Sequence, residues 1–167
     1  MNRRIAIIGE INTEAYAKFS DELYEIENEF KGKEESHYIT LELSSEGGSA
    51  ELALAFSDRI RTSTMAIYVK AYGLVASAAV LILASGDKRY MAKNAWVMVH
   101  EEGLELEGDV SGVEKQVKHY RRLEDQWAYL LSSMTETSIE EWNKLHKAET
   151  YLNAKQCLEL GLIDKVI

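Results

Sequence analysis

The alternation of apolar and polar residues predicts a chain that opens strand, helix, strand. A short apolar run at residues 5–8 and a second at residues 38–43 are each followed by turn-forming residues, as buried strands are. Between them, apolar residues recur with the 3.6-residue period of an amphipathic helix over residues 13–30, with Asn12 or Thr13 as its N-cap.

The same alternation continues along the rest of the chain. Strands that alternate with helices indicate an α/β fold built on a largely parallel sheet. No repeat or linker divides the sequence, and its 167 residues suit one compact domain. The further expected elements are helices over residues 50–60, 77–84 and 110–134, strands over 66–71 and 96–99, a helix beginning at Ser138, a helix capped by Asn153, and a terminal strand over 162–167.

Composition limits the expected partners and the expected cellular location. The 28 acidic and 19 basic residues give a net charge of −9, and no basic stripe with interleaved aromatics is present, so no nucleic-acid partner is expected. Cys157 is the only cysteine, and the N-terminus lacks the pattern of a secretory signal, which favours a reducing, cytoplasmic setting. The longest nearly apolar stretch, residues 74–84, is shorter than the ~20 residues of a membrane span, so no membrane association is expected.

Two turns at the ends of predicted strands offer candidate chemistry. Gly47 and Gly48 lie where a strand gives way to a helix, so their amides either form a plain turn or hold an oxyanion. Ser77 lies at a similar junction, where its hydroxyl is either a helix cap or a nucleophile. Each motif alone is weak.

His100 ends the strand over residues 96–99, at the edge of an open sheet where ligands bind. An imidazole can take the proton of a serine hydroxyl if a third group orients the ring. The other histidines, His37, His119 and His146, are expected at the surface, because each lies in a charged segment. Together the amide turn, the hydroxyl and the imidazole could form one catalytic site.

The combination resembles the ClpP-like proteolytic subunits of the Clp protease, within the ClpP/crotonase superfamily. The family's Ser-Pro-Gly-Gly motif has its counterpart at 45–48, and its Gly-x-Ala-Ala-Ser-Met-Gly-Ala motif at 73–80. Residues 88–100 resemble the family segment that ends in Val-Met-Ile-His, and residues 151–164 resemble its C-terminal motif. The resemblance extends over about residues 4–167 and implies the repeated β-β-α spiral of that superfamily.

The resemblance implies a serine-type endopeptidase that uses Ser77 as nucleophile and His100 as base. The third position of the family's triad, an aspartate, is Glu149 here, which can orient a histidine from a longer side chain or can be a plain surface glutamate. The backbone amides of Gly48 and Ala78 would form the oxyanion hole. No metal or organic cofactor is implied.

By the same resemblance, peptides or unfolded proteins bind as an added strand beside Gly47 and the segment after His100. Glu101 and Glu102 replace the family's Gln-Pro there, which makes the cleft more acidic and disfavours acidic peptides.

The helix over residues 110–134 resembles the family's handle, which interlocks two rings; the alternative is a long helix folded back on its own domain. One domain, 1–167, is therefore expected, with a head at about 1–100 and 135–167 and a handle at about 101–134. The implied assembly is a homo-oligomer of stacked heptameric rings, a closed tetradecamer. The family's axial N-terminal segment, which contacts an AAA+ Clp unfoldase, has no counterpart before the first strand, and this disfavours that partner.

Two other functions compete with an active peptidase. A catalytically inactive structural subunit of a ClpP-like ring is suggested by Glu46, Glu149 and the Glu101-Glu102 pair, although Ser77 and His100 argue against it. A crotonase-like acyl-CoA enzyme shares the spiral and the paired-amide site, but the chain is short and lacks an evident carboxylate pair for acid–base chemistry.

Overall fold

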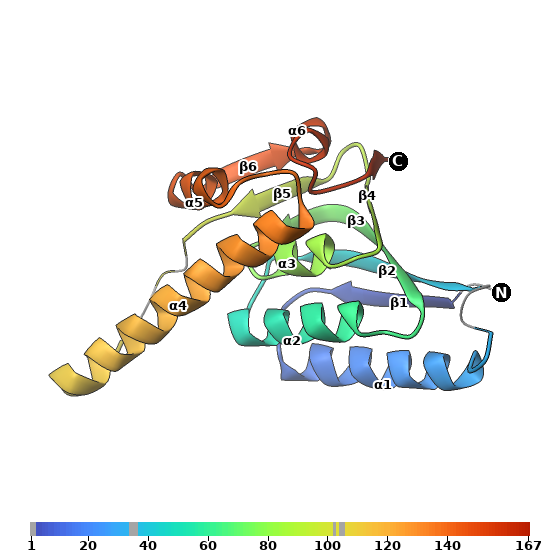
Figure 1. The fold of residues 1–167 in the computed structure, drawn as a ribbon, viewed down its shortest axis with the longest axis horizontal. Coiled ribbons are helices and arrows are strands. Elements are labelled where there is room, and N and C mark those ends of the chain that lie inside the picture. The colour runs from blue at the N-terminus through green and yellow to red at the C-terminus, as the bar shows by residue number, and fades with distance from the viewer. Residues whose placement is uncertain (1–2, 34–36, 102, 104–105) are drawn as a thin grey trace.

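The computed structural model describes residues 3–33, 37–101, 103 and 106–167 (Figure 1). Strands and helices alternate through most of the chain, which confirms the α/β class. In order, the elements are β1 (Arg3–Ile8), α1 (Thr13–Glu29), β2 (Tyr38–Ser45), α2 (Ala50–Arg61), β3 (Ala66–Ala76), α3 (Ala79–Ala84), β4 (Lys88–Met91), β5 (Trp96–Val99), α4 (Val110–Met134), α5 (Ile139–Lys147), β6 (Thr150–Asn153), α6 (Ala154–Glu159) and β7 (Lys165–Val166).

The sheet is parallel except at one pair of strands. Its main path runs β1-β2-β3-β4-β7, and the antiparallel pair β5–β6 branches from β3. The branch arises because β3 changes partner along its length: Tyr68–Ala71 pairs with β4, and Leu74–Ala76 pairs with β5. Gly73, at φ 60°, lies at the switch, in a left-handed conformation that glycine adopts without steric cost.

Helices α1, α2 and α3 lie together along one side of the sheet, whereas α5 and α6 lie beside β5 and β6 (Figure 1). The core between α3 and the strands is apolar because α3 is hydrophobic all round and every one of its residues is buried. Side-chain caps fix the starts of the other helices: Asn12, Ser49, Asp109, Ser138 and Asn153 each accept a hydrogen bond from an amide in the first turn.

The structure adds two strands to the expected elements and shortens two others. The region between Gly86 and Trp96 contains β4, and Thr150–Asn153 forms β6, neither of which was predicted; both strands are only four residues long and too short to show a clear period. The terminal strand is confined to Lys165–Val166. Helix α3 begins at Ala79, after Ser77.

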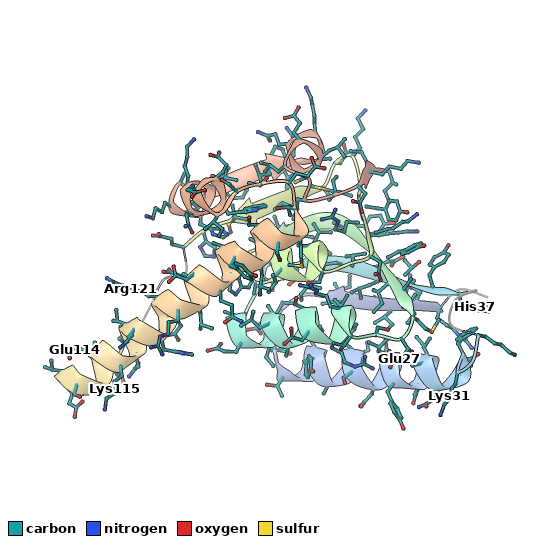
Figure 2. The ribbon with its side chains drawn as sticks, viewed as in Figure 1. Glu27, Lys31, His37, Glu114, Lys115 and Arg121 are labelled. Atoms are coloured by element: carbon teal, nitrogen blue, oxygen red, sulfur yellow. The ribbon has the colours of Figure 1, made fainter. Side chains whose placement is uncertain are left out.

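Helix α4 is long and leaves the body of the molecule at its N-terminal end (Figure 1). Its buried residues, Leu123, Ala128 and Leu131, all lie in the C-terminal half. In the N-terminal half, Glu114, Lys115 and Arg121 extend into solvent (Figure 2). Within the described ranges, no helix is both long enough and apolar enough to cross a membrane.

Candidate active site

Three parallel strands end at the same edge of the sheet, and each end supplies one part of the candidate site. β2 leads into Gly47 and Gly48, β3 leads into Ser77, and β5 leads into His100. Because Ala76 pairs with Met98 in parallel register, Ser77 and His100 leave neighbouring strands within two residues of the same level. This is the edge at which open α/β sheets bind ligands.

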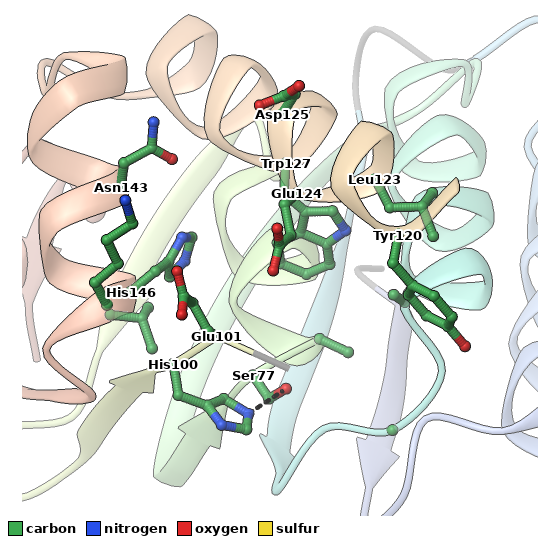
Figure 3. A pocket seen from close by; sticks show the side chains of 15 residues that line it. Ser77, His100, Glu101, Tyr120, Leu123, Glu124, Asp125, Trp127, Asn143 and His146 are labelled. Atoms are coloured by element: carbon green, nitrogen blue, oxygen red, sulfur yellow. Dashed lines mark hydrogen bonds between the residues drawn. The ribbon is translucent and has the colours of Figure 1, made fainter. Parts of the chain in front are cut away.

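Ser77 and His100 are in direct contact. The Ser77 Oγ lies 3.0 Å from the His100 Nε2, within hydrogen-bond distance (Figure 3). With the ring proton on Nδ1, Nε2 accepts the hydroxyl proton, which is the geometry a general base needs.

The backbone of Ser77 excludes the capping role that the sequence left open. Ser77 has a φ of 52°, in the left-handed region that a non-glycine residue adopts at a cost of about 1–3 kcal/mol. Its amide donates to the Met98 carbonyl at 2.8 Å, which anchors this turn to β5. Ala78 occupies the N-cap position of α3, and the helix has no side-chain cap. The hydroxyl of Ser77 is thus directed to His100.

The glycine turn packs against Ser77. A Cβ on Gly47 would lie 2.7 Å from the Ser77 Cβ, so only glycine fits there. Gly48 is held by Ile11 on its other side, where the Ile11 carbonyl accepts from the Ser49 amide at 2.9 Å. Among the described residues, neither the Gly48 amide nor the Ala78 amide donates a hydrogen bond to another group of the chain. Both amides therefore remain as donors beside the serine.

Glu149 is separate from this pair. It lies at the corner between α5 and β6, exposed, with a φ of 47°. Because Val99 pairs with Thr150 in antiparallel register, Glu149 comes next to His100 along the ladder. Its amide donates to the His146 carbonyl at 3.1 Å, but within the described part of the chain its carboxylate forms no hydrogen bond with His100. The structure therefore brings the side chains of Ser77 and His100 into contact. Glu149 is next to His100 only through its backbone.

Glu101 follows His100 and is exposed at the mouth of the site, where its amide donates to the His146 carbonyl at 3.1 Å. Glu102, also expected in the substrate cleft, lies outside the described residues.

A cavity of about 200 Å³ opens beside Ser77 and His100, between α4 and α5. Tyr120, Leu123 and Trp127 line its α4 side, and Asn143, His146 and Lys147 line its α5 side (Figure 3). Sequence reasoning did not assign any of these six to the site. The only signal in the sequence was spacing: His146 and Asn143 are one helical turn apart, and so are Trp127 and Leu123.

The expected surface position of His146 is wrong. The residue was expected at the surface because α5 is rich in charge, yet it is partly buried in the cavity wall. Burial, and secondarily the charge of nearby His100, lowers the pKa of His146 to about 4. At neutral pH its imidazole is therefore uncharged. His119, by contrast, is exposed on α4, as expected.

Comparison with known proteins assigns the chain to a family. The family model described as Clp protease matches residues 1–167. The ATP-dependent Clp protease proteolytic subunit 2 of Treponema denticola is 31% identical over 166 residues, which cover 98% of this chain and 81% of the relative. This agrees with the resemblance that the motifs predict, and the chain belongs to the Clp protease family.

Proposed function

We propose that this chain, a Clp-type protease subunit, is a serine endopeptidase that hydrolyses peptides and unfolded proteins, with Ser77 as nucleophile and His100 as general base. The observation that carries the proposal is the 3.0 Å contact between the Ser77 Oγ and the His100 Nε2 at the end of two parallel strands. The left-handed backbone of Ser77 supports it, because such strain is concentrated at functional sites.

The chemistry follows from that contact. His100 Nε2 removes the hydroxyl proton as Oγ attacks the substrate carbonyl carbon, and the imidazolium then gives this proton to the leaving amine as the peptide bond breaks. Water attacks the resulting acyl-serine ester, again with His100 as base, and releases the acid product and the free hydroxyl. Protons and electron pairs balance with no metal or cofactor.

The amides of Gly48 and Ala78 would stabilise the oxyanion that forms on the carbonyl oxygen. Gly48 and Ala78 line the same cavity as Ser77, and neither amide donates to another group of the chain among the described residues. Loss of one such donor costs about 10²–10³ in kcat in other hydrolases.

Glu149 is the proposed third member, which orients His100 and stabilises its charged form. Its backbone lies next to His100 at the end of the β5–β6 ladder, and this position supports the role. Catalytic triads with a glutamate as the third member occur on other folds.

A peptide substrate would bind as an added strand between Gly47 and the segment after His100. Glu101 at the mouth of the cleft, together with Glu102, would disfavour acidic peptides.

The proposed assembly is a closed tetradecamer of two heptameric rings, with the chain as one domain whose handle is α4. The unburied N-terminal half of α4 supports this, because an isolated helix face of that length gains stability only against a partner. The relative from Treponema denticola is named ATP-dependent. Here cleavage would require ATP only where an AAA+ unfoldase supplies the substrate. A cytoplasmic location is part of the same proposal.

Peptide hydrolysis by the assembled protein tests this function. The Ser77→Ala and His100→Ala variants should each lose at least about 10³-fold in kcat/KM, and Glu149→Ala on the order of 10²-fold or more. Glu140→Ala, which removes an exposed carboxylate of α5, is the matched control and should keep wild-type activity. Equal activity in wild type and Ser77→Ala would reject the proposal.

A further inference from the structure

Two helices line the cavity beside Ser77. Helix α4 lines it with Leu123 and Trp127, which offer mostly apolar surface, and with Tyr120 and the exposed Glu124 and Asp125. Helix α5 lines it with Asn143 and His146, which carry polar groups (Figure 3). A substrate side chain that enters the cavity therefore meets the apolar surface of Leu123 and Trp127 and the hydrogen-bonding groups of Asn143 and His146.

The two half-buried polar side chains of α5, those of Asn143 and His146, are electrically neutral at neutral pH, whereas Lys147 is exposed. Burial beside His100 lowers the pKa of His146 to about 4, so at neutral pH its imidazole presents one donor nitrogen and one acceptor nitrogen. The amide of Asn143 likewise offers both a donor and an acceptor. This pair can satisfy a substrate group that both donates and accepts.

The charged groups of the cavity are confined to its exposed residues. Glu101, Glu124 and Asp125 carry negative charge, and Lys147 is the positive group among the described lining residues. The negative excess opposes a carboxylate, and a charged end inside the cavity would lose hydration without a buried counter-charge.

We infer that His146 is a specificity-determining residue, which directs cleavage after a residue with an apolar stem and a neutral hydrogen-bonding end, with glutamine as the best match. The residue whose carbonyl is attacked lies nearest to Ser77, so its side chain is the one that the adjoining cavity can hold. This inference rests on the proposed peptidase function and adds to it the class of substrate side chain.

The test uses three internally quenched peptides that differ at one position, glutamine, methionine or glutamate, with the cleaved bond identified by mass spectrometry. Methionine matches the length of glutamine without its amide, and glutamate matches its shape with a charge. Wild-type protein should cleave after glutamine about fivefold more efficiently than after methionine, the effect of one net hydrogen bond, and least efficiently after glutamate.

Variants of His146 connect that preference to its imidazole. His146→Leu should reduce the glutamine-to-methionine ratio of kcat/KM about fivefold, whereas His146→Gln, which keeps a neutral donor and acceptor, should retain it. His119→Leu makes the same change at an exposed position outside the cavity lining and should leave the ratio unaltered.

Each outcome is decisive. A wild-type preference for methionine or glutamate overturns the inference whatever the variants do, and so does an unaltered ratio in His146→Leu. If His146→Leu does not fold, the wild-type ranking and the His146→Gln ratio decide. A different result is also possible: wild type cleaves none of the three peptides, and Ser77 does not react with a fluorophosphonate. That result rejects the proposed function itself, and the inference with it.

Discussion

At the residue scale, the candidate site depends on the close approach of the Gly47 backbone to the Ser77 side chain. This glycine has a φ of 103°, and a Cβ there would lie 2.7 Å from the Ser77 Cβ and 2.9 Å from the Ala76 carbonyl oxygen. The sequence contains a Gly-Gly pair but cannot show which glycine faces the serine, because that contact joins the ends of two strands.

Gly47→Ala should therefore displace the serine turn. We expect a loss of at least about 2–3 kcal/mol in the free energy of unfolding, from the left-handed conformation and the clash together, and a loss of at least about 10²-fold in kcat/KM. Gly32→Ala is the control: Gly32 has a similar φ of 83°, and nothing lies within 4 Å of the place that a Cβ would take, so only the smaller conformational cost and no effect on activity are expected. Urea unfolding and peptide hydrolysis measure both; equal effects of the two substitutions would contradict the packing described for Gly47.

Burial of His146 makes a second prediction at this scale. Its pKa is about 4 in the folded chain and near 6.5 when unfolded, so between these pH values the unfolded chain binds more protons and stability falls as pH falls. His146→Asn should remove roughly 3 kcal/mol of the stability difference between pH 7 and pH 4. His119→Asn, at an exposed position, should leave that difference as in wild type, as measured by urea unfolding at both pH values. An unaltered pH slope in His146→Asn would show that its ring is not buried.

At the element scale, hydrogen bonds of the Glu27 carboxylate connect α1 to the C-terminal end of α2 and the residues after it. The carboxylate accepts from Arg59 Nη2 at 2.5 Å, from Ser63 Oγ at 2.8 Å and from the Thr64 amide at 3.1 Å. Burial alone would raise the pKa of Glu27, but these hydrogen bonds outweigh it and lower the pKa. Figure 2 shows Glu27 on α1, on the lower side of the molecule.

Glu27→Gln should cost about 1–3 kcal/mol of unfolding free energy at pH 7, because the hydrogen bonds to charge weaken. Since the folded pKa is depressed, the stabilisation is present above the unfolded pKa of about 4.3 and is lost as pH falls through the lower folded value. The difference between variant and wild type should thus shrink at pH 3. Glu29→Gln, on the same helix, breaks an exposed pair with Arg3 and should cost less than about 1 kcal/mol. Equal costs for both substitutions would contradict the account of Glu27.

The elements that the sequence predicts well are the long periodic ones. The α1 and α4 predictions hold because apolar residues there recur over many turns, and Asn12 proves to be the N-cap of α1. β4 and β6 were missed because a segment of four residues cannot show a period. The pairing of β6 with β5 is what places Glu149 next to His100. The Ser77–His100 pair was predictable from its place at strand ends, whereas the cavity residues of α4 and α5 come from helix packing, which the sequence pattern does not specify.

At the scale of the whole molecule, the N-terminal half of α4 has no buried residue in the isolated chain. Val110 is 77% exposed, and no residue before Leu123 in this helix is buried. The proposed ring-to-ring contact would cover this part of α4 in the assembly.

Val117→Asp should prevent that contact and reduce the native mass from fourteen chains to seven, because a carboxylate would be buried without a counter-charge. Ser111→Asp adds the same charge on an exposed position of the same helix and should leave the mass unchanged. Native mass spectrometry or sedimentation velocity measures this. If the two variants have the same mass as wild type, α4 does not join the rings through Val117.

Ser77 is proposed as an activated nucleophile, and reaction with a fluorophosphonate probe reports directly on that activation. The assembled wild-type protein and its Ser77→Ala variant would each be incubated with the probe, digested, and searched by mass spectrometry for the adduct. One adduct is expected, on Ser77, and it should be absent from the variant. A folded, assembled wild-type sample with no adduct, or with an adduct elsewhere that persists in the variant, would contradict the proposed activation and indicate a catalytically inactive subunit of the family.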